Sequence, residues 1–303
     1  MWIAKTKESW LRIKMLIDDL IEYCDKQYQD GECRACTGRE RCTNECDGNC
    51  KLCLDDIHFH AHQRRTKYDC ERLLYYYICR YSYKYCSEMI YALRQIDLSN
   101  YPYFHILSLG CGGAPDLMAF QYMDYPQKLS YVGLDKNVYW EEVHNYIIDN
   151  FEDGRVQFLR NIDVLQYFDN HEITKCNVII IQYLISFFYS NVGVIGVRRW
   201  FSKLAQSIVK NKPENSPMLI IINDVDSINT GRDALPFFVE EIERVGLSVN
   251  RELRRRFKSA NYFANSVQYA SKRNIFDGIS DEFQKDYCVA LSCESAQLIL
   301  EVI

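Results

Sequence analysis

The spacing of hydrophobic and polar residues changes one third of the way along the chain. In the first third, apolar residues recur at every third or fourth position over residues 2–28 and 64–96, as they do along one face of an amphipathic helix. In the remainder, short apolar runs alternate with helical patterns, and a serine, an asparagine and a proline separate the two parts. We therefore expect a helical domain over residues 1–99 and a second domain over residues 100–303.

The second domain has the pattern of alternating strands and helices. Runs rich in apolar and β-branched residues predict seven strands, at 104–110, 129–135, 156–161, 176–183, 218–224, 248–257 and 297–302. Helical patterns separate the first six of these runs. Strands that alternate with helices form βαβ units, in which the strands run mainly parallel and helices cover both faces of the sheet. The sequence thus predicts an α/β fold with a mainly parallel, seven-stranded sheet.

Composition and charge place the chain among globular proteins. It is 48% hydrophobic and 25% charged, and its net charge of −5 excludes a protein that coats nucleic acid through bulk charge. The 22 residues from Cys176 to Val197 carry no charge and are long enough for a membrane span, but several polar side chains among them would need partners in lipid. We interpret this run as a buried strand with the loop behind it. Because the N-terminal residues lack the apolar core of a secretion signal, we expect a cytoplasmic protein without a membrane span.

Six of the 14 cysteines lie in one short run, CRACTGRERCTNECDGNCKLC. Two Cys-x-x-Cys pairs bracket a spacer of 13 residues, a spacing that brings four thiolates to one tetrahedral zinc ion. Two further cysteines lie inside the spacer, and histidines follow the run. The predicted ligands of one or two zinc ions are Cys33, Cys36, Cys42, Cys46, Cys50, Cys53, His58 and His60.

The segment that holds these ligands, residues 33–62, has little apolar material for a core of its own. Metal binding would therefore supply its folding free energy, and the predicted zinc is structural. An iron–sulfur cluster uses the same thiolates and stays open as an alternative. A disulfide framework is a further alternative, which a reducing compartment disfavours.

Three glycines fall within four positions in the run ILSLGCGGAPD, at the end of the first predicted strand. Such clusters occur where φ must be positive or where the backbone must come close to a ligand. Asp135 ends the second predicted strand, 25 residues after Gly110. A carboxylate there can accept hydrogen bonds from both ribose hydroxyls of a nucleotide-like cofactor, because ligands of parallel sheets bind beyond the carboxyl ends of the strands.

Residues 100–303 resemble the class I S-adenosylmethionine-dependent methyltransferases. The turn motif LSLGCGGAPDL, the acid that ends the second strand and a further acid after the third strand, in FLRNIDVLQYF, carry the resemblance. It implies a Rossmann-like sheet, S-adenosylmethionine as cofactor and methyl transfer as the activity. The cofactor-binding residues that it implies are Gly110, Cys111, Gly112, Gly113, Asp135, Asn161, Ile162, Asp163 and Gln182.

The resemblance also indicates where the methyl group would be transferred. Gln182 and Tyr183, at the end of the fourth strand, occupy the position nearest the methyl group. Asp224, at the end of the fifth strand, is a candidate proton acceptor or substrate-orienting group, and helix capping is at least as good an interpretation of it. Methyl transfer from a sulfonium needs little beyond alignment of the nucleophile, so the lack of an obvious base does not argue against catalysis.

Basic residues beside aromatic ones suggest a macromolecular acceptor. Arg254, Arg255, Arg256 and Lys258 precede a tyrosine and a phenylalanine, a combination that suits single-stranded or looped RNA, although a solvated face explains it equally well. We expect a methyltransferase that acts on RNA rather than on protein. The alternatives are a non-catalytic adaptor that binds a protein partner through its zinc module, and a small-molecule methyltransferase.

Overall fold

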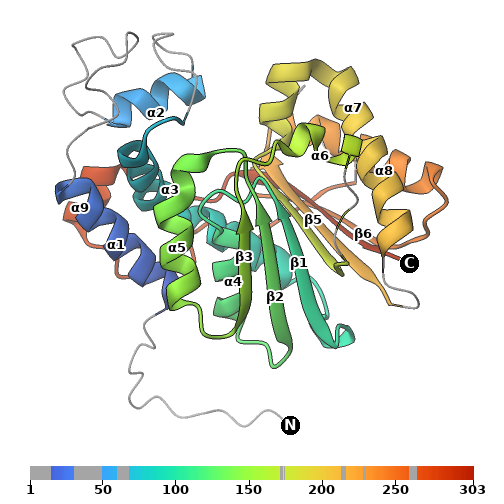
Figure 1. The fold of residues 1–303 in the computed structure, drawn as a ribbon, viewed down its shortest axis with the longest axis horizontal. Coiled ribbons are helices and arrows are strands. Elements are labelled where there is room, and N and C mark those ends of the chain that lie inside the picture. The colour runs from blue at the N-terminus through green and yellow to red at the C-terminus, as the bar shows by residue number, and fades with distance from the viewer. Residues whose placement is uncertain are drawn as a thin grey trace.

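The computed structural model describes residues 15–30, 50–59, 68–170, 173, 175–212, 216–227, 230–258 and 265–303. One eight-stranded sheet crosses the centre of the molecule, with the strand order β3-β2-β1-β4-β5-β8-β6-β7 (Figure 1). Its strands are β1 (Tyr103–Leu109), β2 (Lys128–Leu134), β3 (Gly154–Leu159), β4 (Val178–Gln182), β5 (Met218–Val225), β6 (Val249–Arg256), β7 (Val267–Gln268) and β8 (Ser295–Val302).

The pairing of the strands defines a Rossmann-like sheet. Strands β1 to β5 run parallel to one another, and β8 lies antiparallel between β5 and β6. All seven predicted strands are confirmed, with ends that shift by about two residues or fewer. The predicted total of seven is wrong by one, because β7 pairs with β6 at the edge of the sheet. A strand of two residues is too short to leave a periodic pattern in the sequence.

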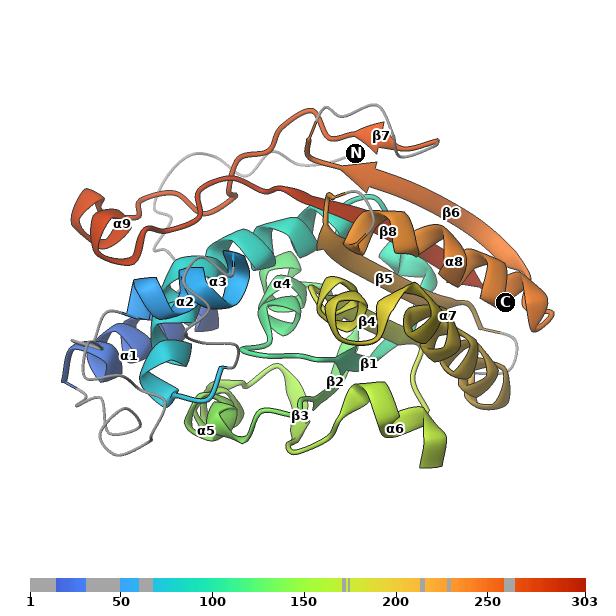
Figure 2. The same ribbon diagram turned by 90° about the horizontal axis from the view of Figure 1, so that it is seen from above.

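Helices cover both faces of the sheet, with one group on either side of the strands (Figure 2). The first group packs on the face where the N-terminal helices lie, and it consists of α1 (Leu16–Asp30), α3 (Glu71–Leu93), α4 (Pro115–Met123) and α5 (Glu141–Asn150). The second group consists of α6 (Val164–Asn170), α7 (Ile185–Asn211) and α8 (Gly231–Arg244). The remaining helices are α2 (Cys50–Phe59), α9 (Asp281–Tyr287) and the short η1 (Leu98–Asn100) and η2 (Val138–Trp140).

Helix α3 ties the N-terminal helices to the sheet. One cluster of buried apolar side chains runs from Leu16 in α1 through Leu74 in α3 to Ile299 in β8. Several tyrosines of α3 are buried in the same cluster, so its aromatic faces serve packing. The domain boundary expected at residue 99 stays a prediction, and the described residues on its two sides share one core.

The uncharged run between Cys176 and Val197 forms β4 and the first part of α7. The side chains of β4 are buried up to its last residue. Residues 185–193, which we expected in a loop, are helical as far as Gly193, where φ of 64° and ψ of −177° interrupt the helix. Within the described ranges, no helix combines the length and the apolar content that crossing a membrane requires.

Candidate functional site

The turn between β1 and α4 meets the end of β2 at the carboxyl edge of the sheet. The amides of Gly110 and Cys111 both donate to the carbonyl of Leu134, at 2.8 and 3.0 Å. Gly110 and Gly112 have φ of 70° and 50°, in the left-handed region that favours glycine. The first two glycines of the predicted motif are therefore required by backbone conformation.

Gly113 has a different role in the same turn. A Cβ atom there would lie 2.1 Å from Cδ1 of Ile78, a side chain of α3. A Cβ atom on Gly110 would likewise come within 2.9 Å of Cδ1 of Leu184, which follows β4. Packing against α3 is thus sufficient to explain Gly113, and its predicted contact with a cofactor stays a prediction.

Asp135 connects this turn to the end of β2. Its Oδ2 accepts a hydrogen bond from the amide of Gly112 at 2.9 Å, and its Oδ1 accepts one from the amide of Asn137 at 2.8 Å. Burial raises the pKa of the carboxyl above its usual value, although these backbone hydrogen bonds act in the opposite direction. Because each carboxylate oxygen has two lone pairs, Asp135 keeps acceptor capacity for ribose hydroxyls.

His144, on α5, contacts the glycine turn through its imidazole. The sequence pattern did not predict this contact. The Nε2 of His144 lies 2.8 Å from the carbonyl oxygen of Gly112, and donation from Nε2 leaves Nδ1 without a partner among the described residues. Burial lowers the pKa of the imidazole to about 4, so the ring is neutral at physiological pH. A lone histidine in an amphipathic helix gives no sequence signal of this contact.

The residues predicted to border an adenine lie next to Asp135. The amide of Ile162 donates to the carbonyl of Asp135 at 3.0 Å, and Asn161 adopts a left-handed φ of 60°. Asp163 accepts a hydrogen bond from the amide of Leu165 at 3.1 Å and an ion pair from Lys136 at 2.6 Å. The structure therefore brings the predicted residues together, and it gives Asp163 partners at both carboxylate oxygens.

A row of aromatic rings leads from this turn to the end of β4. Trp140 lies beside Gly112, whose Cβ position would be 3.6 Å from the indole ring. From there the ring centroids of Trp140 and Tyr77 are 6.1 Å apart, those of Tyr77 and Tyr81 5.1 Å, and those of Tyr81 and Tyr85 5.3 Å. Tyr85 then meets Tyr183 at 4.3 Å. Burial raises the pKa of Tyr85 and Tyr183 well above the usual range, so both phenols are neutral.

Gln182 and Tyr183 are placed at the end of β4, as predicted. The Nε2 of Gln182 donates to the carbonyl of Tyr85 at 2.9 Å, and its Oε1 is buried without a partner among the described residues. Tyr183 adopts a left-handed φ of 55°, which is costly for a residue with a side chain. Its hydroxyl donates to Glu88 at 2.7 Å. This pair of residues therefore offers a free acceptor and a fixed hydroxyl at the same edge.

Asp224 has a capping role. Its carboxylate accepts hydrogen bonds from the amides of Ile185 at 2.7 Å, Ser186 at 3.2 Å and Val225 at 2.8 Å. The side chain is fully buried, and a Cβ atom on Gly231 would lie 2.4 Å from its Oδ1. These contacts favour helix capping of α7 over proton transfer, because acceptance from several amides holds the carboxylate at the helix start.

Glu88 is the buried acid at this edge that sequence reasoning missed. Its Oε2 accepts from Tyr183 and from Nδ2 of Asn223 at 3.0 Å, and its Oε1 accepts from the amide of Glu294 at 2.9 Å. Gln297 joins the same cluster by donating to Oδ1 of Asn223 at 3.0 Å. In the sequence, an acid on a long helix indicates a solvated face, so only the packing of α3 on the sheet reveals this cluster.

Most predicted metal ligands fall outside the described residues, namely Cys33, Cys36, Cys42, Cys46 and His60. Cys50, Cys53 and His58 lie on α2. Both ring nitrogens of His58 have tyrosine partners, Tyr68 at 2.7 Å and Tyr81 at 3.2 Å, and burial lowers its pKa to about 4. The structure thus shows His58 packed among tyrosines, and its predicted zinc ligation stays a prediction. Within the part of the chain that is described, no cluster of three or more candidate ligands could hold a metal ion.

The predicted basic cluster does not form one surface. Successive side chains of a strand point to opposite faces, so Arg255 lies on the same face as Gln297, and Arg254 and Arg256 lie on the other. Arg254 donates to Glu252 at 2.5 Å, and Arg256 is buried. Of the four predicted residues, Lys258 alone is exposed. The periodicity of the strand therefore divides the run, and RNA binding stays a prediction.

No known protein-family profile and no curated protein sequence matches the chain. Solved structures with a similar arrangement include the plantazolicin methyltransferase BpumL in complex with SAH, at 10% identity and a TM-score of 0.43, with 93% of this chain and 99% of that chain covered. They also include a SAM dependent methyltransferase from Archaeoglobus fulgidus (12%, TM-score 0.40, 71% and 94% covered). A third is the methyltransferase domain of bacterial CtHen1-CN (13%, TM-score 0.42, 71% and 97% covered).

Proposed function

We propose that the protein is an S-adenosylmethionine-dependent methyltransferase whose cofactor binds over the turn that follows β1. One observation carries this proposal. A turn with two left-handed glycines is hydrogen-bonded, through Gly112, to Asp135 at the carboxyl edge of a parallel sheet, in which an antiparallel β8 lies between β5 and β6. A mainly parallel, Rossmann-like sheet is what the resemblance to class I methyltransferases implies.

The residues at this edge fit the cofactor. Asp135 retains lone pairs for the ribose hydroxyls, and Ile162 and Asp163 lie beside it for the adenine. The buried Oε1 of Gln182 lacks a partner among the described residues, and a donor such as the ammonium of the methionine moiety would satisfy it. The neutral aromatic row between Trp140 and Tyr183 would attract a sulfonium, because ring faces stabilise cations.

When bound, S-adenosylmethionine supplies an activated methyl group. The chain's own task is then to align an acceptor nucleophile with it. Because the hydroxyl of Tyr183 donates to Glu88, its oxygen keeps lone pairs that can accept a hydrogen bond from the acceptor's N–H or O–H. Tyr183 is therefore proposed to orient the acceptor, Glu88 is proposed to hold Tyr183 in place, and Gln182 is proposed to hold the methionine end of the cofactor beside them.

Binding of S-adenosylhomocysteine, measured by calorimetry, tests the proposal. We expect Asp135→Ala to weaken binding at least tenfold, because charge-assisted hydrogen bonds to the ribose are lost. Asp149→Asn, a change to an exposed acid on α5, serves as the control and should leave binding unchanged. Absence of binding to the wild-type protein would refute the proposal, and equal binding by wild type and Asp135→Ala would place the ribose elsewhere.

For the methyl acceptor we propose RNA, on the narrow ground that Lys258 is exposed just after β6, the strand that carries the half-buried Arg254. Incubation with labelled cofactor and separate fractions of cellular RNA, protein and metabolites identifies the acceptor. Label in RNA supports this part of the proposal. Label in protein or in small molecules alone replaces it and leaves the proposed reaction intact.

We also propose a structural zinc site in residues 33–62, supported by the spacing of the two Cys-x-x-Cys pairs. Cys50 and Cys53 lie one turn apart at the start of α2, which is compatible with their sharing an ion with ligands from the preceding residues.

One observation favours a second candidate function, a binding protein that has lost catalysis. Leu184 and Ile78 approach Gly110 and Gly113 so closely that the turn is packed by the protein itself. If the folded wild-type protein does not bind S-adenosylhomocysteine, that result supports this second candidate.

A further inference from the structure

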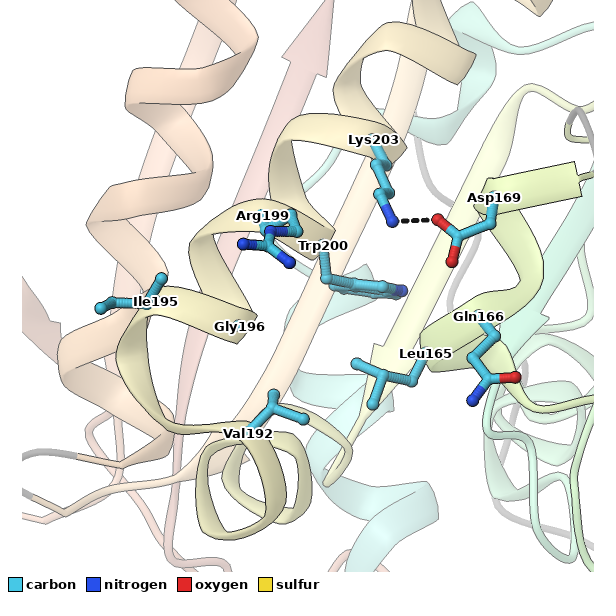
Figure 3. Close-up of a pocket in the computed structure, with 9 residues that line it drawn as sticks. All are labelled: Leu165, Gln166, Asp169, Val192, Ile195, Gly196, Arg199, Trp200 and Lys203. Atoms are coloured by element: carbon cyan, nitrogen blue, oxygen red, sulfur yellow. Dashed lines mark hydrogen bonds and ion pairs between the residues drawn. The ribbon is translucent and has the colours of Figure 1, made fainter.

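A cleft with a volume of about 340 Å³ opens between α6 and α7, on the face of the sheet opposite α3 (Figure 3). None of its lining residues belongs to the candidate cofactor site. Leu165 from α6 and Val192, Ile195 and Trp200 from α7 supply its apolar wall. Sites for small molecules typically have volumes of about 300–1,000 Å³ and apolar walls with a few polar groups, so this cleft has the dimensions of a ligand site.

The interruption of α7 shapes the cleft. At Gly193 the chain turns out of the helix, and the next turn presents Ile195 to solvent with 74% of its surface exposed. Val192 packs against Gly196, where a Cβ atom would lie 2.4 Å from the valine Cβ. Exposed apolar side chains that lie close together indicate an interaction surface or a ligand-binding groove.

The charges at the cleft favour an anion. Lys203 forms an ion pair with Asp169, drawn as a dashed line in Figure 3. Arg199 lines the same cleft and has no ion-pair partner among the described residues. The lining residues therefore carry a net charge of about +1, and the guanidinium of Arg199 is the group available to bind a carboxylate in a bidentate manner.

The neighbouring Arg198 has a different environment. Its guanidinium lies 3.6 Å from the ring centroid of Phe237 and 3.8 Å from a carboxylate oxygen of Glu240, both on α8. It does not line the cleft. The two adjacent arginines thus differ in position while sharing their chemistry, which provides a matched control.

We propose that the cleft between α6 and α7 binds a small amphipathic carboxylate, with its apolar body against Leu165, Val192 and Trp200 and its carboxylate on Arg199. This site is separate from the proposed cofactor site, and the inference does not rest on methyl transfer. A ligand bound in the cleft would cover the apolar surface of Ile195 and so remove it from water.

Calorimetric titration with decanoate, and with decanol as its uncharged counterpart, tests the proposal. We expect saturable binding of decanoate to the wild-type protein and weaker binding of decanol. Arg199→Gln should weaken decanoate binding about tenfold and leave decanol unaffected, because the lost interaction is with the carboxylate. Arg198→Gln should leave the binding of both ligands unchanged.

A second variant tests the cleft itself. Val192→Trp places a larger side chain among the residues that line the cleft and should abolish decanoate binding, while circular dichroism and the unfolding midpoint confirm that the variant is folded. The inference is overturned if decanoate does not bind the wild-type protein saturably. It is equally overturned if Arg198→Gln and Arg199→Gln weaken binding to the same extent, or if folded Val192→Trp binds decanoate as the wild type does.

Discussion

Acidic residues at the carboxyl edge of the sheet show how one side chain can serve both fold and ligand. Asp135, Asp163 and Asp224 each accept hydrogen bonds from backbone amides of a neighbouring turn or helix. A carboxylate held in this way keeps its position whether or not a ligand is present. Asp135 differs from the other two because it is bonded to the glycine turn itself, where the proposed cofactor lies.

Glu88 provides the sharpest test at the scale of a residue. All three groups that bond to its carboxylate are donors: the Tyr183 hydroxyl, the Asn223 amide and the backbone amide of Glu294. Glu88→Gln would turn an NH₂ group toward one of these donors and leave it unpaired. We expect a loss of about 2–4 kcal/mol in the free energy of unfolding, measured with urea.

The matched control is Glu243→Gln, the same chemical change at an exposed side chain of α8. Surface substitutions usually change stability by about 0.5 kcal/mol or less, so this variant should lose little stability. Equal losses for the two variants would mean that Glu88 is not the centre of the buried cluster.

At the scale of elements, the sequence predicted strands better than the start of α7. Each strand is a local apolar run, and its pattern is complete within a few residues. The first turns of α7 depend on a contact with Asp224, which lies 39 positions from Ile185 in the sequence. Such a tertiary cap is invisible to periodicity, and Gly193 breaks the helical pattern that follows. The burial of Glu88 and the contact of His144 were missed for the same reason.

The predicted zinc segment is also tested as an element. Elemental analysis of the purified protein should find one or two zinc ions per chain, because residues 33–62 have little apolar material for a core of their own. Replacement of Cys33 and Cys36 by serine should reduce the zinc content, whereas Cys288→Ser, a half-exposed cysteine after α9, should not. Iron with acid-labile sulfide would identify an iron–sulfur cluster instead. Metal-free protein with its thiols paired in disulfides would contradict the prediction.

At the scale of the whole molecule, two buried titratable groups flank the glycine turn and respond oppositely to acid. His144 is fully buried, and burial lowers its pKa from 6.5 to about 4. Asp116, at the start of α4, is equally buried, and burial raises its pKa from 3.8 to about 6, even though the hydroxyl of Tyr131 donates to it at 3.1 Å. The neutral form is favoured in both cases, because burial disfavours charge of either sign.

The signs follow from proton uptake by each state. The unfolded chain protonates His144 near pH 6.5 and the folded chain only near 4, so the stability that this residue contributes is complete above pH 6.5 and is lost as the pH falls toward 4. The folded chain protonates Asp116 near pH 6 and the unfolded chain only near 3.8, so its destabilising effect is largest above pH 6 and is relieved as the pH falls toward 3.8. In the wild-type protein the two slopes oppose each other within the same window.

Single substitutions should therefore separate the two slopes. Between pH 7 and pH 4.5, the stability of His144→Gln relative to wild type should rise by about 2 kcal/mol. The variant has no imidazole at this position, so it lacks the proton uptake by the unfolded chain that destabilises the wild type. The relative stability of Asp116→Asn should fall by about 2 kcal/mol over the same interval, because the variant lacks the relief that protonation gives the wild type. Urea unfolding of the three proteins at both pH values measures these differences. Changes of the same sign in the two variants would show that the region around the glycine turn does not exclude charge as its burial implies.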